Sequence, residues 1–339
     1  MNISYVENIE GIDYKQLNAM LEKNTTKKAV RGVSHTQTVF ENSQYFVFAY
    51  NLNQLIGAIR AISDGEWAVI YDFVVIKEYA TRQIKEEILS RLVKQLVGQH
   101  IFTNATLETL SFYEENGFQR TKTAFTYVGF KQGEKNYSKG YFLPQGYQFE
   151  NEFFEVKLPF IKRHVPTKKK KVTISYRTSR SGVDYKRVNE IINRAFKDEG
   201  SWHSENIDII EIEKTRHLFD ISQYVSFAYD GDRLVGVARA ITDQLEEAYI
   251  QNVAIDPDYQ GYGIGWQVTV TLCEAILKAG LNPFLHTHPG AVGFYNRAGF
   301  LRNKIAVDYR GKEDQNSQIP IEVEQGFYLP RGYRFIDEF

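Results

Sequence analysis

Residues 223–243 read QYVSFAYDGDRLVGVARAITD, and residues 44–64 read QYFVFAYNLNQLIGAIRAISD, in register and without a gap. Similarity between two distant parts of one chain is the mark of a repeated structural unit. This pair of segments therefore predicts that the chain holds two copies of one fold.

Further matching segments flank this pair in the same order in both halves of the chain. They are 11–21 with 182–192, 111–118 with 293–300, and 140–153 with 326–339. Between the copies, Lys168–Lys171 form a basic run beside a proline, which is typical of a solvated linker. We expect a first domain at 1–162, a linker at 163–171 and a second domain at 172–339.

The second copy carries a regular succession of strand and helix patterns. Val188, Ile191, Ile192 and Ala195 recur at helical spacing, and Asp230-Gly231 is a hairpin-turn dipeptide between two strand patterns. Strand patterns also cover 171–177, 248–255, 283–288 and 304–310, and helix patterns cover 206–219, 267–279 and 290–299. The order βααβββαβαβ predicts an α/β (α+β) fold, with a mixed, mainly antiparallel sheet flanked by helices and one parallel crossover.

Composition narrows the class of protein. The chain has 339 residues, of which 43% are hydrophobic and 24% charged, and its net charge is −1. No global field favours nucleic acid or an anionic membrane, and no apolar run approaches the ~20 residues of a bilayer span. No basic and apolar leader precedes the first copy, so we expect a cytoplasmic protein. Cys273 lies in an apolar helical pattern and is expected to be a buried, inert thiol.

A glycine-rich loop follows one strand pattern of the second copy. Residues 253–265 read VAIDPDYQGYGIG, with glycines at alternate positions before a helix pattern. Glycine lets the backbone approach a ligand closely, and N–H groups at a helix amino terminus attract an anion such as a diphosphate. The loop lacks the Gly-Lys-Ser/Thr of nucleotide triphosphatases, and its GxGxG spacing differs from the dinucleotide GxGxxG.

The loop resembles the signature of the GNAT acetyltransferase superfamily, Gln/Arg-x-x-Gly-x-Gly/Ala after a strand. Gln260, Gly263 and Gly265 occupy its three positions, and the later segment FYNRAGF is similar to the family's Phe-Tyr-x-x-x-Gly-Phe. The resemblance implies that acetyl-CoA is the cofactor, with its diphosphate on the loop and its pantetheine arm along the preceding strand. The implied cofactor-binding residues are Val253, Ala254, Ile255, Gln260, Gly261, Tyr262, Gly263, Ile264 and Gly265.

Acetyl transfer to an amine needs an acid for the leaving thiolate, a donor to the oxyanion and a base for the amine. The resemblance assigns the acid to Tyr295 of FYNRAGF, whose alternative role is that of a core aromatic. A backbone N–H near Val253 or Ala254 would serve the oxyanion. Glu247 is a candidate base. Gln251 lies on the same face of that strand and is a candidate substrate contact.

Two histidines end the next strand pattern. His288 is a second candidate base, because imidazole titrates near neutral pH, and His286 is a candidate substrate contact. No carboxylate or cysteine cluster accompanies them, so we expect no metal. Trp202 and His203 lie between the two helix patterns. The resemblance implies that the acceptor pocket forms there, which makes them candidate substrate contacts. The competing interpretation is that the two side chains only pack on the surface.

The first copy departs from the signature. Residues 74–89 read VVIKEYATRQIKEEIL, without any of the three glycines. Side chains at Thr81, Arg82 and Lys85 would crowd a diphosphate, and Glu86 would repel it. We expect a degenerate domain that supports the other copy. The opposing possibility is that Arg82 and Lys85 bind coenzyme A in another way.

These observations favour an N-acetyltransferase that acts on a primary amine of a small molecule, with neither nucleic acid nor membrane as partner. The alternatives are a non-catalytic acyl-CoA sensor and acetylation of proteins or peptides. An aminoacyl transferase that uses charged tRNA is disfavoured by the near-neutral charge and the intact loop. The sequence leaves the acceptor and the oligomeric state open.

Overall fold

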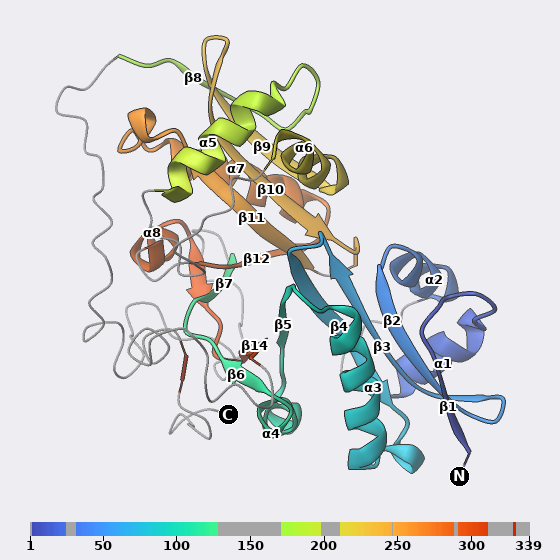
Figure 1. Cartoon of the computed structure of the whole chain (residues 1–339). Coiled ribbons are helices and arrows are strands. Elements are labelled where there is room, and N and C mark those ends of the chain that lie inside the picture. Colours follow the sequence, from blue (N-terminus) through green and yellow to red (C-terminus); the bar gives the residue numbers. More distant parts are fainter. Residues whose placement is uncertain are drawn as a thin grey trace.

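The chain folds around two mixed β-sheets of seven strands each. The computed structural model describes residues 2–24, 32–127, 171–197, 211–245, 247–287, 291–310 and 328–329. Both sheets are mainly antiparallel, with one parallel pair in each: β4 (Trp67–Val75) with β5 (His100–Asn104), and β11 (Glu247–Ile255) with β12 (Asn282–His286). The predicted fold class is therefore confirmed, and Figure 1 shows the two sheets with their helices.

The first sheet has the strand order β1-β2-β3-β4-β5-β14-β6. Its strands are β1 (Ile3–Val6), β2 (Tyr45–Asn51), β3 (Gln54–Ser63), β4 (Trp67–Val75), β5 (His100–Asn104), β6 (Phe118–Arg120) and β14 (Ala306–Tyr309). The helices of this half are α1 (Tyr14–Asn24), α2 (Val33–Glu41), the 3-10 turn η1 (Lys77–Tyr79), α3 (Arg82–Gln95) and α4 (Leu107–Glu115).

The second sheet has the strand order β13-β7-β12-β11-β10-β9-β8. Its strands are β7 (Ala124–Tyr127), β8 (Ile174–Arg177), β9 (Tyr224–Asp230), β10 (Arg233–Thr242), β11 (Glu247–Ile255), β12 (Asn282–His286) and β13 (Phe300–Arg302). The helices of this half are α5 (Tyr185–Lys197), α6 (Ile212–Ile221), the 3-10 turn η2 (Pro257–Tyr259), α7 (Ile264–Lys278) and α8 (Val292–Arg297).

Each sheet takes one strand from the other half of the chain. β7 pairs with β12 and β13, and β14 pairs with β5 and β6. In Figure 1 the green β7 lies beside β12, and the red β14 lies beside β6. The sequence repeat gives no sign of this exchange, which makes each sheet dependent on both halves. The domain boundaries drawn from the repeat stay predictions.

Local sequence explains most of the elements. The four apolar positions of the predicted helix 183–196 are buried in α5, and the Asp230-Gly231 turn joins β9 to β10 as predicted. Helix α7 begins at Ile264, three residues before the predicted start, because the glycine loop leads directly into it. Cys273 is buried in α7, as predicted, and burial raises the pKa of its thiol.

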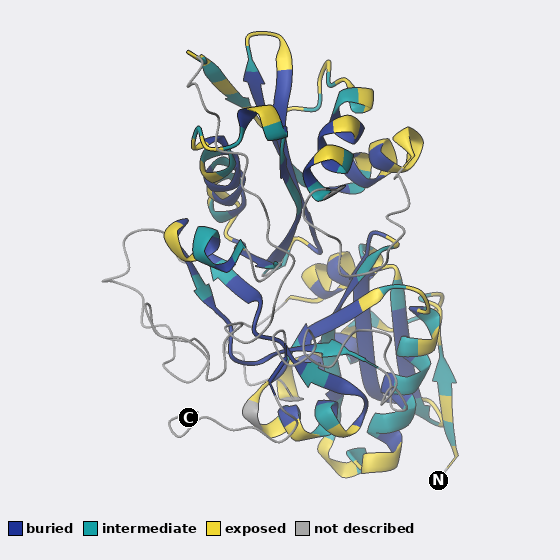
Figure 2. Ribbon diagram, turned by 60° about the vertical axis from the view of Figure 1, so that its left-hand side comes forward, coloured by how far each residue is buried: buried dark blue, intermediate teal, exposed yellow. Residues whose placement is uncertain are grey.

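The two sheets share a buried apolar core, which Figure 2 shows as dark blue strands where the halves meet. Phe102 of β5 contacts the second sheet, with its ring centroid 4.5 Å from that of Tyr249 and 5.8 Å from that of Phe284. The buried members of this cluster are Ile62, Val69, Phe102, Ile241, Tyr249 and Phe284.

A reciprocal pair of buried arginines crosses the same interface. Arg60 of β3 donates to Asp243 of the second half, and Arg239 of β10 donates to Asp64 of the first half at 2.5 Å. Both arginines are at most 1% exposed. Because the two contacts occupy equivalent positions of the repeat, the halves are related by approximate twofold symmetry, with an ionic contact on each side.

Candidate functional site

Strands β11 and β12 separate partway along their length. They pair in parallel only from Glu247–Asn282 to Tyr249–Phe284, whereas β11 continues to Ile255. Asn252 has a left-handed φ of 48°, and the register of β10 with β11 shifts beside it. Among the described residues, the end of β11 pairs only with β10, so its other edge is open to an added strand.

The predicted cofactor residues surround the end of this open edge. Val253, Ala254 and Ile255 are the last residues of β11, and Gln260, Gly261 and Tyr262 follow the short turn η2. Gly263 is the N-cap of α7, and Ile264 and Gly265 begin the helix. The Gln260 side chain donates to the Ile255 carbonyl oxygen at 3.4 Å, which ties the loop to the strand.

The loop needs glycine at two positions for conformational reasons. Gly261 and Gly263 have φ values of 82° and 78°, in the left-handed region that favours glycine. Gly263 provides no side chain to cap α7, and a Cβ built on it would meet no described atom within 4 Å. The first N–H groups of α7 lack intrahelical acceptors and point toward this space. The site thus fits a diphosphate.

Helix α7 packs close to the sheet at its amino terminus. A Cβ on Gly265 would lie 3.4 Å from Cγ1 of Ile255 and 3.7 Å from Cζ of Phe294. A Cβ on Gly236 of β10 would lie 2.6 Å from Cδ1 of Ile255, too close without a shift. The small residues thus bring α7, α8 and the end of β11 together.

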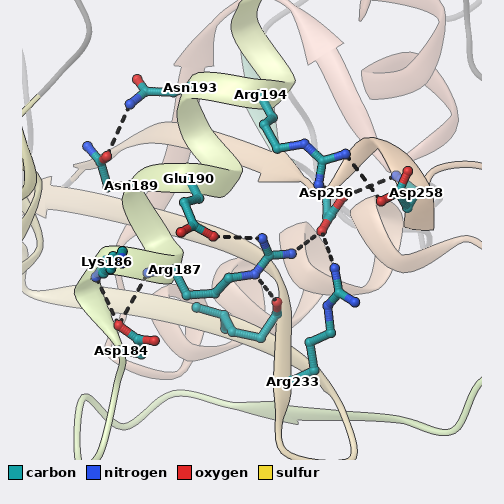
Figure 3. Close-up of polar contacts among 11 residues, drawn as sticks. Asp184, Lys186, Arg187, Asn189, Glu190, Asn193, Arg194, Arg233, Asp256 and Asp258 are labelled. Carbon is teal, nitrogen blue, oxygen red and sulfur yellow. Dashed lines mark hydrogen bonds and ion pairs between the residues drawn. The ribbon is translucent and has the colours of Figure 1, made fainter.

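A buried carboxylate fixes the start of the loop. Asp256 is fully buried and forms ion pairs with Arg187, with Arg194 at 2.8 Å and with Arg233 at 3.4 Å (Figure 3). Arg194 also contacts Asp258 at 3.2 Å. Because Arg187 and Arg194 belong to α5 and Arg233 to β10, this network joins both elements to the loop. Its members are far apart in the chain, so no local sequence pattern predicts this network.

Tyr295 lies on α8 in the same core that contains the first residues of α7. It is 7% exposed, and its ring centroid lies 5.8 Å from Phe125, 4.9 Å from Phe294 and 5.3 Å from Phe300. Phe125 belongs to the exchanged strand β7, so the other half of the chain helps to position this tyrosine. The role of Tyr295 as the acid stays a prediction.

The other predicted residues divide into two groups. Gln251 and His286 lie near the fork of β11 and β12, and Glu247 begins β11, with both carboxylate oxygens 3.5 Å from Nδ2 of Asn104 in β5. The remaining three, Trp202, His203 and His288, lie outside the described residues. Asp308 of β14 was not among the predicted residues, and its Oδ1 lies 3.4 Å from Nε2 of His286. Its signal was an acidic residue inside a strand pattern that aligns with Thr126 of the first copy.

Comparisons with known proteins agree with this architecture. The profile of the "Acetyltransferase (GNAT) family" matches residues 185–300, and that of the "Acetyltransferase (GNAT) domain" matches residues 11–132. These are two α/β acyltransferase domains in tandem. The chain belongs to the GNAT acetyltransferase family.

Curated relatives match parts of the chain. A mycothiol acetyltransferase of Geodermatophilus obscurus is 31% identical over 150 residues, which are 40% of this chain and 47% of the relative. An uncharacterized N-acetyltransferase, ycf52 of Porphyra purpurea, is 38% identical over 76 residues, which are 22% of this chain and 44% of the relative. The chain thus spans about half the length of the curated relatives it matches.

One solved structure shares the tandem arrangement. It is a tandem GNAT protein from the clavulanic acid biosynthesis pathway. The structural match covers 91% of this chain and 98% of that protein's chain, with a TM-score of 0.52 and 10% sequence identity. This likeness concerns the fold alone. Within the described residues, no helix has the length and apolar character to span a bilayer, and no group of three or more His, Cys, Asp or Glu residues is placed to hold a metal ion.

Proposed function

We propose that the chain is an N-acetyltransferase that moves an acetyl group from acetyl-CoA to a primary amine of a small molecule. The observation that carries this proposal is the left-handed Gly263 at the uncapped start of α7, beside the open edge of β11. In this proposal the loop N–H groups bind the diphosphate, and the main chain of Val253–Ile255 binds the pantetheine arm. Acetyl-CoA supplies the acetyl group as an activated thioester. A relative named for mycothiol supports a small-molecule acceptor.

The reaction breaks a carbon–sulfur bond and forms a carbon–nitrogen bond. One proton must therefore leave the acceptor nitrogen, and one must reach the thiolate sulfur. In this proposal the Tyr295 hydroxyl gives the second proton, and a main-chain N–H near Val253 donates to the developing oxyanion. The low exposure of Tyr295 keeps bulk water away from that proton.

We also propose that the first domain does not bind coenzyme A. Helix α3 begins at Arg82, so residues 82–84 are helical where the aligned residues 261–263 form the glycine loop. The Thr81 side chain accepts a hydrogen bond from the N–H of Ile84 at 3.4 Å, which uses one amide that a diphosphate would need. Arg82 pairs with Glu86 at 2.9 Å and with Glu115 at 3.1 Å. Calorimetric titration with acetyl-CoA tests this: we expect one molecule per chain, and two would contradict it.

The test of the activity is a screen of amines, polyamines, aminoglycosides and peptides for thiol release that depends on acetyl-CoA, followed by mass measurement of the product. The matched variants are Tyr295→Phe and Tyr113→Phe, which alter aligned tyrosines of the two halves. We expect Tyr295→Phe to lower kcat on the order of 100-fold with little change in acetyl-CoA affinity. Tyr113→Phe should leave kcat unchanged.

Each alternative predicts a different outcome of the screen. A sensor would bind acetyl-CoA tightly while thiol release stays at background with every amine. A protein acetyltransferase would modify peptides in preference to small amines. Equal kcat values for Tyr295→Phe and the wild type would show that Tyr295 does not donate the proton to the thiolate.

A further inference from the structure

A buried polar cluster lies between the two sheets, where β11 and β12 separate. Gln251 and His286 each lie two residues beyond the last pair of these strands, Tyr249 with Phe284, and therefore on the same face of the sheet. Gln251 is 8% exposed, and the His286 side chain is 7% exposed. Within the described parts of the chain, neither the Gln251 amide atoms nor the His286 ring nitrogens have a hydrogen-bond partner.

The third member of the cluster comes from the opposite sheet. Asp308 of the exchanged strand β14 pairs with Phe102, and the Phe102 ring centroid lies 4.4 Å from that of His286. Oδ1 of Asp308 lies 3.4 Å from Nε2 of His286 without hydrogen-bond geometry, and Oδ2 accepts from the Tyr328 hydroxyl at 3.3 Å. Its side chain is 23% exposed, although Oδ1 itself is buried.

This arrangement is costly unless a ligand completes it. Burying a polar group without a partner is unfavourable, and such groups are rare in folded proteins. Here a carboxylate oxygen, an imidazole and an amide converge from three strands, beside the open edge of β11. Together they offer acceptors and donors suited to a protonated amine.

We propose that this cluster is the subsite for the acceptor amine, and that Oδ1 of Asp308 takes the proton that leaves the amine nitrogen. The acceptor enters as an ammonium group and loses two protons. The first N–H bond breaks as an O–H bond forms on Asp308, which leaves the neutral amine that attacks the thioester. The second proton leaves the nitrogen after the attack and replaces the proton that Tyr295 gives to the thiolate, so no other reactant is needed. His286 and Gln251 orient the nitrogen. This inference rests on the proposed function and names the group that receives the proton in it.

The electrostatics around Asp308 suit this role. Burial raises its pKa to about 7, against the opposing effects of the Tyr328 hydrogen bond and of Arg310. Burial lowers the pKa of His286 to about 3, so the imidazole is neutral at physiological pH. Burial also raises the pKa of Tyr249, and Asp308 raises it further, so that phenol stays protonated. Asp308 is therefore the group of this cluster that titrates near neutral pH.

The subsite gives the first half of the chain a function. Asp308 lies in the first sheet, between β5 and β6, although it belongs to the second half of the sequence. Without the first sheet, β14 would have no described strand partner and Asp308 would not face His286. A copy without its own cofactor loop is thus needed to hold the proton acceptor of the other copy.

The test uses the full chain, acetyl-CoA and the amine that gives the fastest thiol release in the screen. Asp308→Asn keeps the shape and removes the charge, and Asp232→Asn at the exposed tip of the β9–β10 hairpin is the matched control. We expect Asp308→Asn to keep its acetyl-CoA affinity and to lower kcat/KM at least about 100-fold. The wild-type rise of kcat/KM through about pH 7 should disappear. Added formate should restore part of the rate of Asp308→Ala, which a merely structural role would not allow.

A second measurement does not depend on turnover. Carbon-detected NMR of the aspartate carboxyls should show Asp308 titrating near pH 7. A midpoint near 4, or an Asp308→Asn enzyme within threefold of the wild type with the same pH profile, would overturn the proposal. Failure of the proposed function looks different: the wild type then releases no thiol with any amine, although Asp308 still titrates near neutrality.

Discussion

Replacing Gly263 with alanine should separate cofactor binding from folding. Gly263 has a φ of 78°, and a Cβ there would meet no described atom within 4 Å. The methyl group therefore costs only the strain of a left-handed alanine, about 1–2 kcal/mol. It projects, however, into the space at the start of α7 that the account assigns to the diphosphate.

The loss of affinity follows from the hydrogen bonds that the methyl group would disturb. A hydrogen bond to a charged group contributes about 1.5–3 kcal/mol, so losing two amide–phosphate bonds costs at least about 3 kcal/mol. That corresponds to a Kd for acetyl-CoA roughly 100-fold weaker.

Gly280 provides a control at the other end of the same helix. Its φ is 83°, and a Cβ there would also meet nothing within 4 Å, so Gly280→Ala has the same strain. Calorimetry should show wild-type affinity for acetyl-CoA in Gly280→Ala. Denaturant unfolding should show a similar small loss in the free energy of unfolding for both variants. Equal affinities for the two variants, whether both normal or both weak, would refute the reasoning.

Three further predictions concern buried charges. Asp243→Asn removes one carboxylate partner of the buried Arg60, so the free energy of unfolding, measured with denaturant, should fall by about 3 kcal/mol, as it should for Asp64→Asn. A decrease under about 0.5 kcal/mol would be inconsistent with the buried pairing. Because burial raises the pKa of Asp308 from 3.8 to about 7, the folded state binds its proton more tightly than the unfolded state. The stability of the wild type relative to Asp308→Asn should therefore fall between about pH 4 and pH 7, by up to about 4 kcal/mol, and an equal difference at pH 5 and pH 8 would argue against the shift. Asp256→Asn should speed amide hydrogen exchange in residues 260–265, since three arginines lose their shared anion, and unchanged exchange would show that the network does not hold the loop.

Much of the fold could be predicted because its signals are local. The helical spacing of Val188, Ile191 and Ile192 and the Asp230-Gly231 turn depend on residues a few positions apart, and both elements form as predicted. The glycine loop is equally local, since the backbone conformation of Gly263 is a property of its own position.

The strand exchange could not be predicted because the two halves are similar. A strand pattern at 304–310 indicates that a strand forms, but not which sheet accepts it, and related sheets offer nearly equivalent edges. The same reason hid Asp308: its contact with His286 exists only after β14 joins the first sheet. Asp256 was hidden by distance, because its arginine partners Arg187 and Arg233 lie on separate elements.

A crystal structure of the full chain with coenzyme A bound would test the central claim most directly. The account predicts one molecule per chain, with diphosphate oxygens about 2.7–3.2 Å from main-chain nitrogens of residues 260–265. A cofactor bound at the start of α3, or anywhere else away from α7, would contradict it.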